Sequence, residues 1–216
     1  MSEAVVNFVA LLGWSPEGDQ EIFSLEELAK VFDYRRISKS PAVFDMTKLR
    51  WMNGEYFKAM APEDFYQRAE KYLKEYVKKP LDLRKIAEMV RTRVETFLDI
   101  REMVDFFNAV PAYEAGLFVN KKSKSTRETS RTIFADVLPR LEVVKDWNNN
   151  ALFALLKTYG EEKGYKTGLV MWPLRIALSG KLMTPAGATE IMDVLGKEES
   201  LARLREGQKK LDSAEA

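Results

Sequence analysis

The chain has 216 residues, with 34 lysine and arginine residues against 33 aspartate and glutamate residues, and it contains neither cysteine nor histidine. This length suits one large or two small domains and is ample for a hydrophobic core. The missing residue types exclude disulfides, zinc sites of the Cys/His kind, thiol catalysis and a Ser-His-Asp triad. Because the net charge is only +1, a polyanionic partner must be bound by a local cluster of positive charge.

The apolar run over residues 4–12 is the longest near the start of the chain, and Asn7 interrupts it. It falls well short of the roughly 20 residues that a membrane span needs, and no basic segment precedes it. We therefore predict a cytoplasmic protein from a reducing compartment.

Apolar residues recur at helical spacing along most of the chain, which predicts an all-α fold. Ser24 and Glu27 have the spacing of a capping box that opens a helix over 25–32. Asp45 is placed to cap the next helix, and Pro62 suits the first turn of the one after it.

The middle of the chain contains the best candidate for a domain junction. Asp82 is placed to cap a helix, after which Thr96 with Asp99 either starts a fresh helix or lies within the same one. Residues 109–125 contain a proline, a glycine and few periodic positions. Such a segment is typical of a connection between two domains.

Helical patterns resume in the last part of the chain. Ser125 with Glu128 predicts another helix start. Either Asp146 or Asn148 is placed to cap the helix that Gly164 ends. The four tryptophans stand beside helix-period apolar neighbours and are therefore predicted to lie in the core: Trp14, Trp51, Trp147 and Trp172.

Signals for enzyme chemistry are weak, because the chain has no glycine-rich phosphate loop and no acidic cluster with metal-site spacing. Basic residues are more informative. Over residues 121–131, five positive charges accompany the single acidic residue Glu128: Lys121, Lys122, Lys124, Arg127 and Arg131. Such a cluster at a loop and helix start is either a phosphate-binding surface or an ordinary solvated one.

Arg175 stands out because it lies within the apolar stretch over 173–178. An arginine in such a stretch must extend to the surface, pair with another group or face a ligand. From composition alone, Arg91 and Arg93 would be ordinary surface residues.

Two separated parts of the chain carry a specific pattern. The first part comprises the segments NFVALLGWSP (7–16), EIFS (21–24), SKSPAVFD (38–45) and KLRWMNG (48–54). The second part comprises PLRIALSG (173–180), TP (184–185) and LGKE (195–198). With these segments the chain resembles bacterial-type glutamyl-tRNA synthetase, first in the region after that family's catalytic lysine loop and then in its C-terminal anticodon-binding domain.

This resemblance implies a helical cage of two consecutive helical-bundle anticodon-binding domains. It divides the chain into a stem-contact remnant over 1–58, a first anticodon-binding helical domain over 59–112 and a second over 113–216. The family's nucleotide-binding fold carries a HIGH motif, which a chain without histidine cannot contain. We therefore expect a C-terminal segment of glutamate–tRNA ligase, a class I synthetase, that is inactive by itself. ATP and magnesium would then serve the parent enzyme, with no cofactor or metal in this chain.

The resemblance also assigns site residues by position. Arg93 matches the arginine that contacts the third anticodon base, and three residues match positions at the anticodon loop: Arg175, Thr184 and Pro185. The candidates for contacts with the tRNA backbone are Arg91, Lys121, Lys122, Lys124 and Arg127. At Gly187 the family often has leucine, so this chain departs from the pattern there.

The expected partner is tRNA(Glu), with no DNA and no membrane, and the chain is expected to be a monomer. The alternative hypothesis is a free-standing helical scaffold that meets protein partners through amphipathic faces. The two hypotheses differ in salt-dependent tRNA binding, which follows from released counterions.

Overall fold

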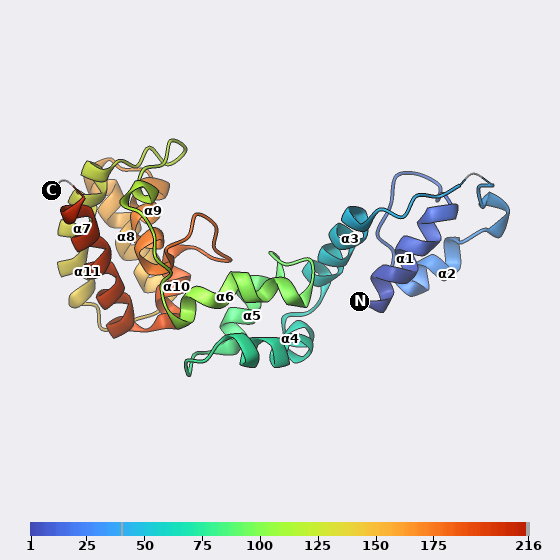
Figure 1. Cartoon of the computed structure of the whole chain (residues 1–216), viewed down its shortest axis with the longest axis horizontal. Helices are drawn as coiled ribbons and strands as arrows, with labels where there is room; N and C mark the ends of the chain where they lie inside the picture. Colours follow the sequence, from blue (N-terminus) through green and yellow to red (C-terminus); the bar gives the residue numbers. More distant parts are fainter. Residues whose placement is uncertain (40, 215–216) are drawn as a thin grey trace.

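The computed structural model describes residues 1–39 and 41–214 as an elongated series of helices (Figure 1). No strand forms within these residues, so the all-α prediction is confirmed; β pairing there is limited to the isolated bridges Trp14–Ile37 and Asn120–Ser125. Ser40, part of the SKSPAVFD segment, lies outside the described residues.

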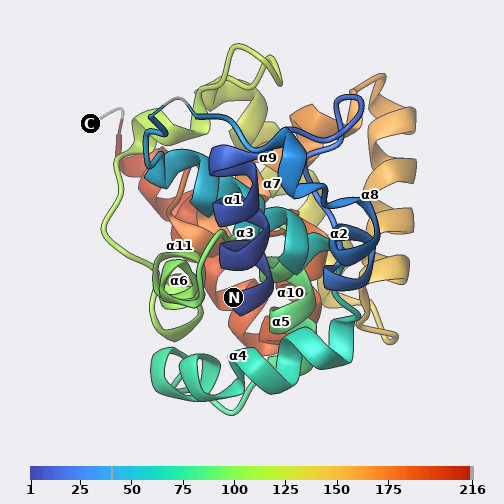
Figure 2. The ribbon, with the colours of Figure 1, turned by 90° about the vertical axis from the view of Figure 1, so that its right-hand side faces the viewer.

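The helices form three groups that follow one another along the molecule, from the blue end to the red end of Figure 1. The first group comprises α1 (Ser2–Gly13), α2 (Leu25–Val31) and α3 (Met46–Ala59). The second comprises α4 (Pro62–Tyr76), α5 (Leu83–Arg91) and α6 (Ile100–Asn108). The third comprises α7 (Arg127–Glu142), α8 (Asn149–Lys163), α9 (Thr167–Ser179), α10 (Ala188–Leu195) and α11 (Lys197–Ser213). In Figure 2, which looks along the long axis, the first group lies in front of the third.

Capping side chains begin these helices where the sequence pattern predicts. The Ser24 amide donates to Glu27 at 2.8 Å, and the Glu27 amide donates to Ser24 Oγ at 3.1 Å, which completes the predicted box. Asp45 and Asp82 each accept two amides at the starts of α3 and α5. Asn148, rather than Asp146, caps α8.

The predicted start of α7 is wrong by one residue. Thr126 and Thr129 form the capping pair, because the preceding Ser125 is buried and its hydroxyl lies 3.2 Å from Ser130 Oγ. The core placement of Trp51 is also wrong. Its side chain is 40% exposed, whereas Trp14 is buried as predicted.

The break between α5 and α6 is a fresh helix start. Thr96 precedes a 3-10 turn over Phe97–Asp99 that leads directly into α6. The Thr96 amide donates to Asp99 at 2.8 Å, which is the capping arrangement that the Thr96–Asp99 spacing allowed.

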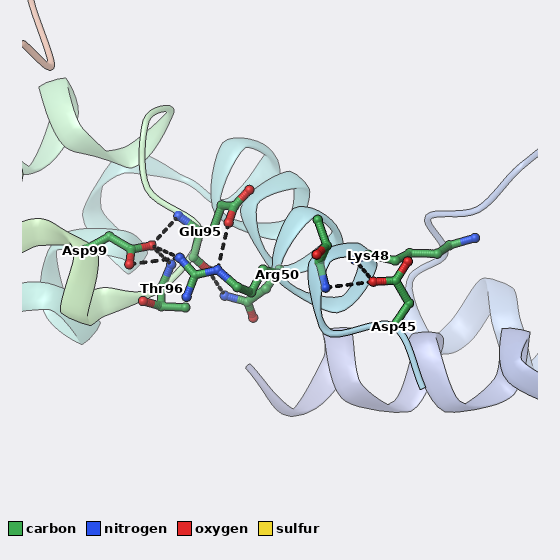
Figure 3. A network of polar contacts seen from close by, with 8 residues as sticks. Asp45, Lys48, Arg50, Glu95, Thr96 and Asp99 are labelled. Carbon is green, nitrogen blue, oxygen red and sulfur yellow. Dashed lines mark hydrogen bonds and ion pairs between the residues drawn. The ribbon is translucent and has the colours of Figure 1, made fainter. Parts of the chain in front are cut away.

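The first and second helix groups meet at a charged joint, shown in Figure 3. Arg50 of α3 donates through Nε to Glu95 at 3.0 Å and through Nη2 to both oxygens of Asp99 at 3.0 Å. The carboxylate of Asp99 also accepts the amides of Glu95 and Thr96. Burial opposes ionisation of Asp99, but these hydrogen bonds outweigh it, so the pKa of that carboxyl lies below its usual value.

The second and third groups share a single cluster of buried side chains that extends to Leu211 and that Phe57, near the end of α3, also joins. Arg203 of α11, only 7% exposed, donates to the carbonyls of Phe106 and Leu178 at 2.8 Å and of Phe107 at 3.1 Å. These carbonyls end α6 and α9, so one guanidinium holds the ends of helices from both groups.

Ion pairs add to this junction: Lys79–Glu199, Lys85–Asp193 and Lys181–Asp105. The helices of the described part are all too short or too polar to cross a membrane.

Candidate nucleic-acid interface

Two adjoining cavities form a groove along the third helix group, and one of them also borders the second group. The α5 cavity, of about 440 Å³, is lined by residues of α5 and the turn after it on one side and by residues of the 181–187 loop and α10 on the other. The α9 cavity, of about 720 Å³, is lined by residues of α8, α9 and the turn over 120–123. Asn149, Gly187 and Glu190 line both cavities, so the two form one continuous groove.

The groove brings together most of the residues that the resemblance assigned. Arg93 and Pro185 line the α5 cavity, although they are far apart in the sequence. Arg175 and Lys122 line the α9 cavity. Thr184 joins them through a direct hydrogen bond with Arg175.

Arg93 is exposed, and its guanidinium makes no hydrogen bond or ion pair within the described residues. Its position directly after α5 leaves the side chain at the edge of the cavity. A free guanidinium presents five donors in a planar fork, which suits the edge of a base or a phosphate.

Arg175, in contrast, is held by the protein itself. It donates to Thr184 Oγ1 at 2.9 Å and to the Leu182 carbonyl at 3.0 Å, and its guanidinium lies 4.6 Å from the ring centre of Trp172. Burial lowers the pKa of Arg175, but an arginine starts so high that the group stays charged at neutral pH. The guanidinium therefore fastens the 181–187 loop to α9.

Thr184 and Lys181 hold the same loop. The Thr184 hydroxyl accepts from Arg175 and donates to the Ala186 carbonyl at 2.7 Å. Lys181 donates to the Glu102 carbonyl at 2.6 Å and pairs with Asp105, both of α6. These contacts fix the backbone on both sides of Pro185, which is presented to the α5 cavity.

The basic residues over 121–124 occupy a tight turn. Asn120 and Ser125 pair through two backbone hydrogen bonds of 2.9 and 3.0 Å, and Lys124 has a positive φ of 59°. Lys121, Lys122 and Lys124 are exposed, and within the described residues their ammonium groups form no ion pair. Arg127, at the first turn of α7, is exposed as well. The turn therefore concentrates uncompensated positive charge beside the α9 cavity.

Arg91 lies on a different surface. Its Nη1 donates to the carbonyls of Lys58, Met60 and Phe57 at the end of α3. The guanidinium therefore satisfies carbonyl groups that the helix leaves unpaired. Arg91 is not among the residues that line the groove.

The sequence patterns missed three apolar side chains at the groove and its loop. Phe153 of α8 is 44% exposed and lines the α9 cavity, while Leu182 and Met183 are 56% and 77% exposed on the 181–187 loop. Phe153 does not lie on the buried face of α8, which is formed by Leu152, Leu156, Tyr159 and Gly160. Comparison of these two helix faces could have indicated its exposure.

Acidic groups offer little for a metal. Residues 1–39 and 41–214 contain no group of three or more aspartates and glutamates gathered closely enough to hold a metal ion. The Glu190 carboxylate in the groove accepts the Gly187 amide at 2.7 Å, at the start of α10. The α5 cavity therefore combines the carboxylates of Glu88, Glu190 and Asp193, of which Asp193 pairs with Lys85, with the donors of Arg93, which are unpaired within the described chain. The α9 cavity has positive charge and apolar faces beside the single carboxylate of Glu190.

Comparison with known proteins shows what the chain is similar to. A glutamate–tRNA ligase of Lachnoclostridium phytofermentans is 51% identical over 214 residues, which are 99% of this chain and 44% of that protein. A glutamate–tRNA ligase of Clostridium acetobutylicum is 48% identical over 213 residues, again 44% of its length. The chain thus spans less than half the length of these relatives.

Solved structures agree with this similarity. The crystal structure of a glutamate tRNA ligase from Elizabethkingia meningosepticum, in complex with its amino acid, matches with a TM-score of 0.78 and 29% identity, over 97% of this chain and 41% of that one. Residues 1–51 match the catalytic domain of class I tRNA synthetases for E and Q. Residues 64–208, more than half of the chain, match the anticodon binding domain. The chain therefore belongs to the anticodon binding domain family, and it is similar over nearly its whole length to glutamate–tRNA ligases.

Proposed function

We propose that the groove binds the anticodon loop of tRNA(Glu), and that the chain is the C-terminal part of a glutamate–tRNA ligase. The observation that carries this proposal is that Arg93 and Pro185 line the same cavity. Pro185 lies on the 181–187 loop, which the hydrogen bond between Arg175 and Thr184 holds in place. The chain covers 44% of the length of its relative, which supports the proposal that it corresponds to one part of the ligase.

Each part of the groove has a separate task in this proposal. Unpaired anticodon bases offer Watson–Crick edges to donors and flat faces to apolar groups. Arg93 pairs with the edge of one base, and Pro185 packs on a face. Lys121, Lys122 and Lys124 neutralise phosphates of the same strand.

Joining glutamate to tRNA with ATP and magnesium is assigned to the catalytic domain, of which residues 1–51 resemble a part. We therefore expect no ATP–pyrophosphate exchange from this chain alone. In this proposal the chain acts in the cytoplasm as a monomer, with the domain boundaries at residues 58 and 112.

The test is filter binding of tRNA(Glu) transcript at about 50 and 200 mM salt. Several released counterions predict binding that weakens at least tenfold between the two conditions. Transcripts with altered anticodons should bind less tightly. The alternative, a scaffold for protein partners, predicts no retention of tRNA at either salt concentration and would replace the proposal.

A further inference from the structure

Phe153 is an exposed aromatic side chain with no aromatic partner among the described residues. It lies on α8 at the wall of the α9 cavity, with 44% of its surface exposed. None of the ring–ring or cation–ring contacts of the described chain involves it, although Trp172 and Lys122 line the same cavity. The phenyl face is therefore available to a ligand that enters the cavity.

Trp172, the other aromatic group of this cavity, is already engaged. Its Nε1 donates to the Leu117 carbonyl at 2.9 Å, which fixes the indole plane, and Arg175 lies over the ring at 4.6 Å. The guanidinium that covers Trp172 is itself held by Thr184 and Leu182. In this cavity the Trp172 ring is therefore already in contact with Arg175, whereas the Phe153 ring is available to stack with a flat ligand.

The positive charges around the cavity favour a polyanion, and the free phenyl ring favours a flat group such as an unpaired base. Lys122 lines the cavity, and Lys121 and Lys124 extend from the same turn without ion pairs to described residues. The carboxylate of Glu190 also lines it and accepts the Gly187 amide, so its negative charge lies at the start of α10 and is outnumbered by the three lysines of the turn. A single-stranded nucleic acid supplies both parts of the matching ligand, phosphates for the ammonium groups and a flat base for the ring.

We propose that Phe153 is a stacking platform for one unpaired base of the bound RNA, separate from the base that Arg93 contacts. This inference rests on the proposed tRNA-binding function and adds a second base site to it. A phenyl ring has no hydrogen-bonding group, so the stacked base contributes affinity without selection among the four bases. Lys122 would hold the phosphate next to that base.

The test compares Phe153→Ala, Phe153→Leu and Phe153→Trp in the full chain, with an anticodon stem-loop RNA as the probe. Loss of one stacked base predicts an approximately tenfold higher Kd for Phe153→Ala. Phe153→Leu should lose nearly as much, since it is apolar but has no ring face, and Phe153→Trp should bind as the unaltered chain does. Because Phe153 is half-buried, loss of its ring should lower the melting temperature only slightly, and all three variants should be fully folded at the temperature of the binding measurement. Tyr34→Ala is the matched control, an exposed aromatic (71%) in the 3-10 turn between α2 and α3 of the first helix group.

A second arm locates the base with probes that lack one base at each loop position. At the stacking position, the missing base should raise the Kd about tenfold for the unaltered chain and leave it unchanged for Phe153→Ala. Equal Kd values for Phe153→Ala and the unaltered chain would overturn the inference, and so would full binding by Phe153→Leu, which would indicate apolar burial without stacking. Failure of the unaltered chain to bind any tRNA would instead overturn the proposed function.

Discussion

Arg93 and Arg175 both line the groove, but Arg93 is exposed whereas Arg175 is partly buried, and they differ in the protein groups that already bind them. Arg175 has two hydrogen bonds and a ring contact within the protein, whereas Arg93 has neither a hydrogen bond nor an ion pair from its side chain within the described part of the chain. A free guanidinium can direct two of its five donors to a base edge. We therefore expect base recognition from Arg93 and a supporting role from Arg175.

Arg93→Ala should weaken binding of tRNA(Glu) and narrow its advantage over a transcript altered at the third anticodon base. An arginine fork on a base edge provides about 1–3 kcal/mol of discrimination, while a phosphate contact provides none. The measurement is the ratio of Kd values for the two transcripts. Equal losses for both would show that Arg93 contacts the backbone only.

Arg175→Ala should lower the melting temperature, unlike Arg93→Ala. The change removes donors from Thr184 and from the Leu182 carbonyl, and hydrogen bonds to a charged group contribute about 1.5–3 kcal/mol. Thermal unfolding of the two variants side by side is the measurement. A melting temperature unchanged by Arg175→Ala would contradict its role in fastening the loop.

At the scale of single elements, charge determines what two segments do: the turn over 120–125 and the charged joint between Arg50 of α3 and Asp99 before α6. The turn holds its lysines apart from any acidic partner in the described residues, so their charge is available to phosphates. At the joint, Arg50 is shared by Glu95 and Asp99, and it connects a helix of the first group to the start of α6.

Replacing Lys121, Lys122 and Lys124 together by alanine should weaken binding to every tRNA alike. Each lysine that contacts a phosphate releases about 0.7–0.9 of a counterion, so the salt slope should fall by at most about three. The slope of log K against log salt concentration measures this loss. An unchanged slope would identify the turn as an ordinary solvated surface.

The Arg50–Asp99 joint predicts a pH dependence of stability. Because the pKa of Asp99 is lower in the folded chain than in the unfolded chain, its contribution is present above the unfolded pKa and is lost as pH falls through the folded value. Its unfolded pKa is about 3.9. The contribution is therefore complete above about pH 5 and declines below about pH 4.

Asp99→Asn should remove this contribution, which we expect to be about 1 kcal/mol because Arg50 is 42% exposed. Urea unfolding of both proteins between about pH 3 and pH 7 is the measurement. The two stabilities should differ at neutral pH and converge in acid, and a difference that stayed constant with pH would contradict the assignment.

At the scale of the whole molecule, the ends of α6 and α9 depend on one side chain. Arg203 is buried and supplies donors to three carbonyls of two helix groups, and it also pairs with Glu199, which pairs with Lys79. Removing a buried charged donor leaves these carbonyls without a partner. The alignment of the groove's two sides therefore depends on a residue that does not line it.

Arg203→Ala should destabilise the chain by about 3 kcal/mol, since it breaks a buried network. Arg205→Ala is the matched control on the same helix, because Arg205 pairs with Glu142 at an exposed position. Urea unfolding gives both values. Similar small losses for the two variants would show that Arg203 does not join the helix groups.

Local signals in the sequence were sufficient for the helical class and for several helix starts. Capping depends on residues two or three positions apart, so it can be predicted from the sequence. The predicted caps that the structure confirms are Ser24, Asp45, Asp82 and Asn148. The cap at Thr126 was missed because Ser125, also a good cap, is drawn into the core by Ser130. Burial of this kind depends on packing, which a local pattern does not contain.

The groove itself required the tertiary structure. The resemblance singled out Arg93, Arg175, Thr184 and Pro185, but only the fold places Arg93 across a cavity from Pro185 and occupies Arg175 with its own loop. The exposure of Phe153 and the role of Arg203 likewise follow from how separate helices pack. Hydrophobic periodicity and capping are properties of neighbouring residues, whereas a binding surface arises from residues that meet across long separations in the chain.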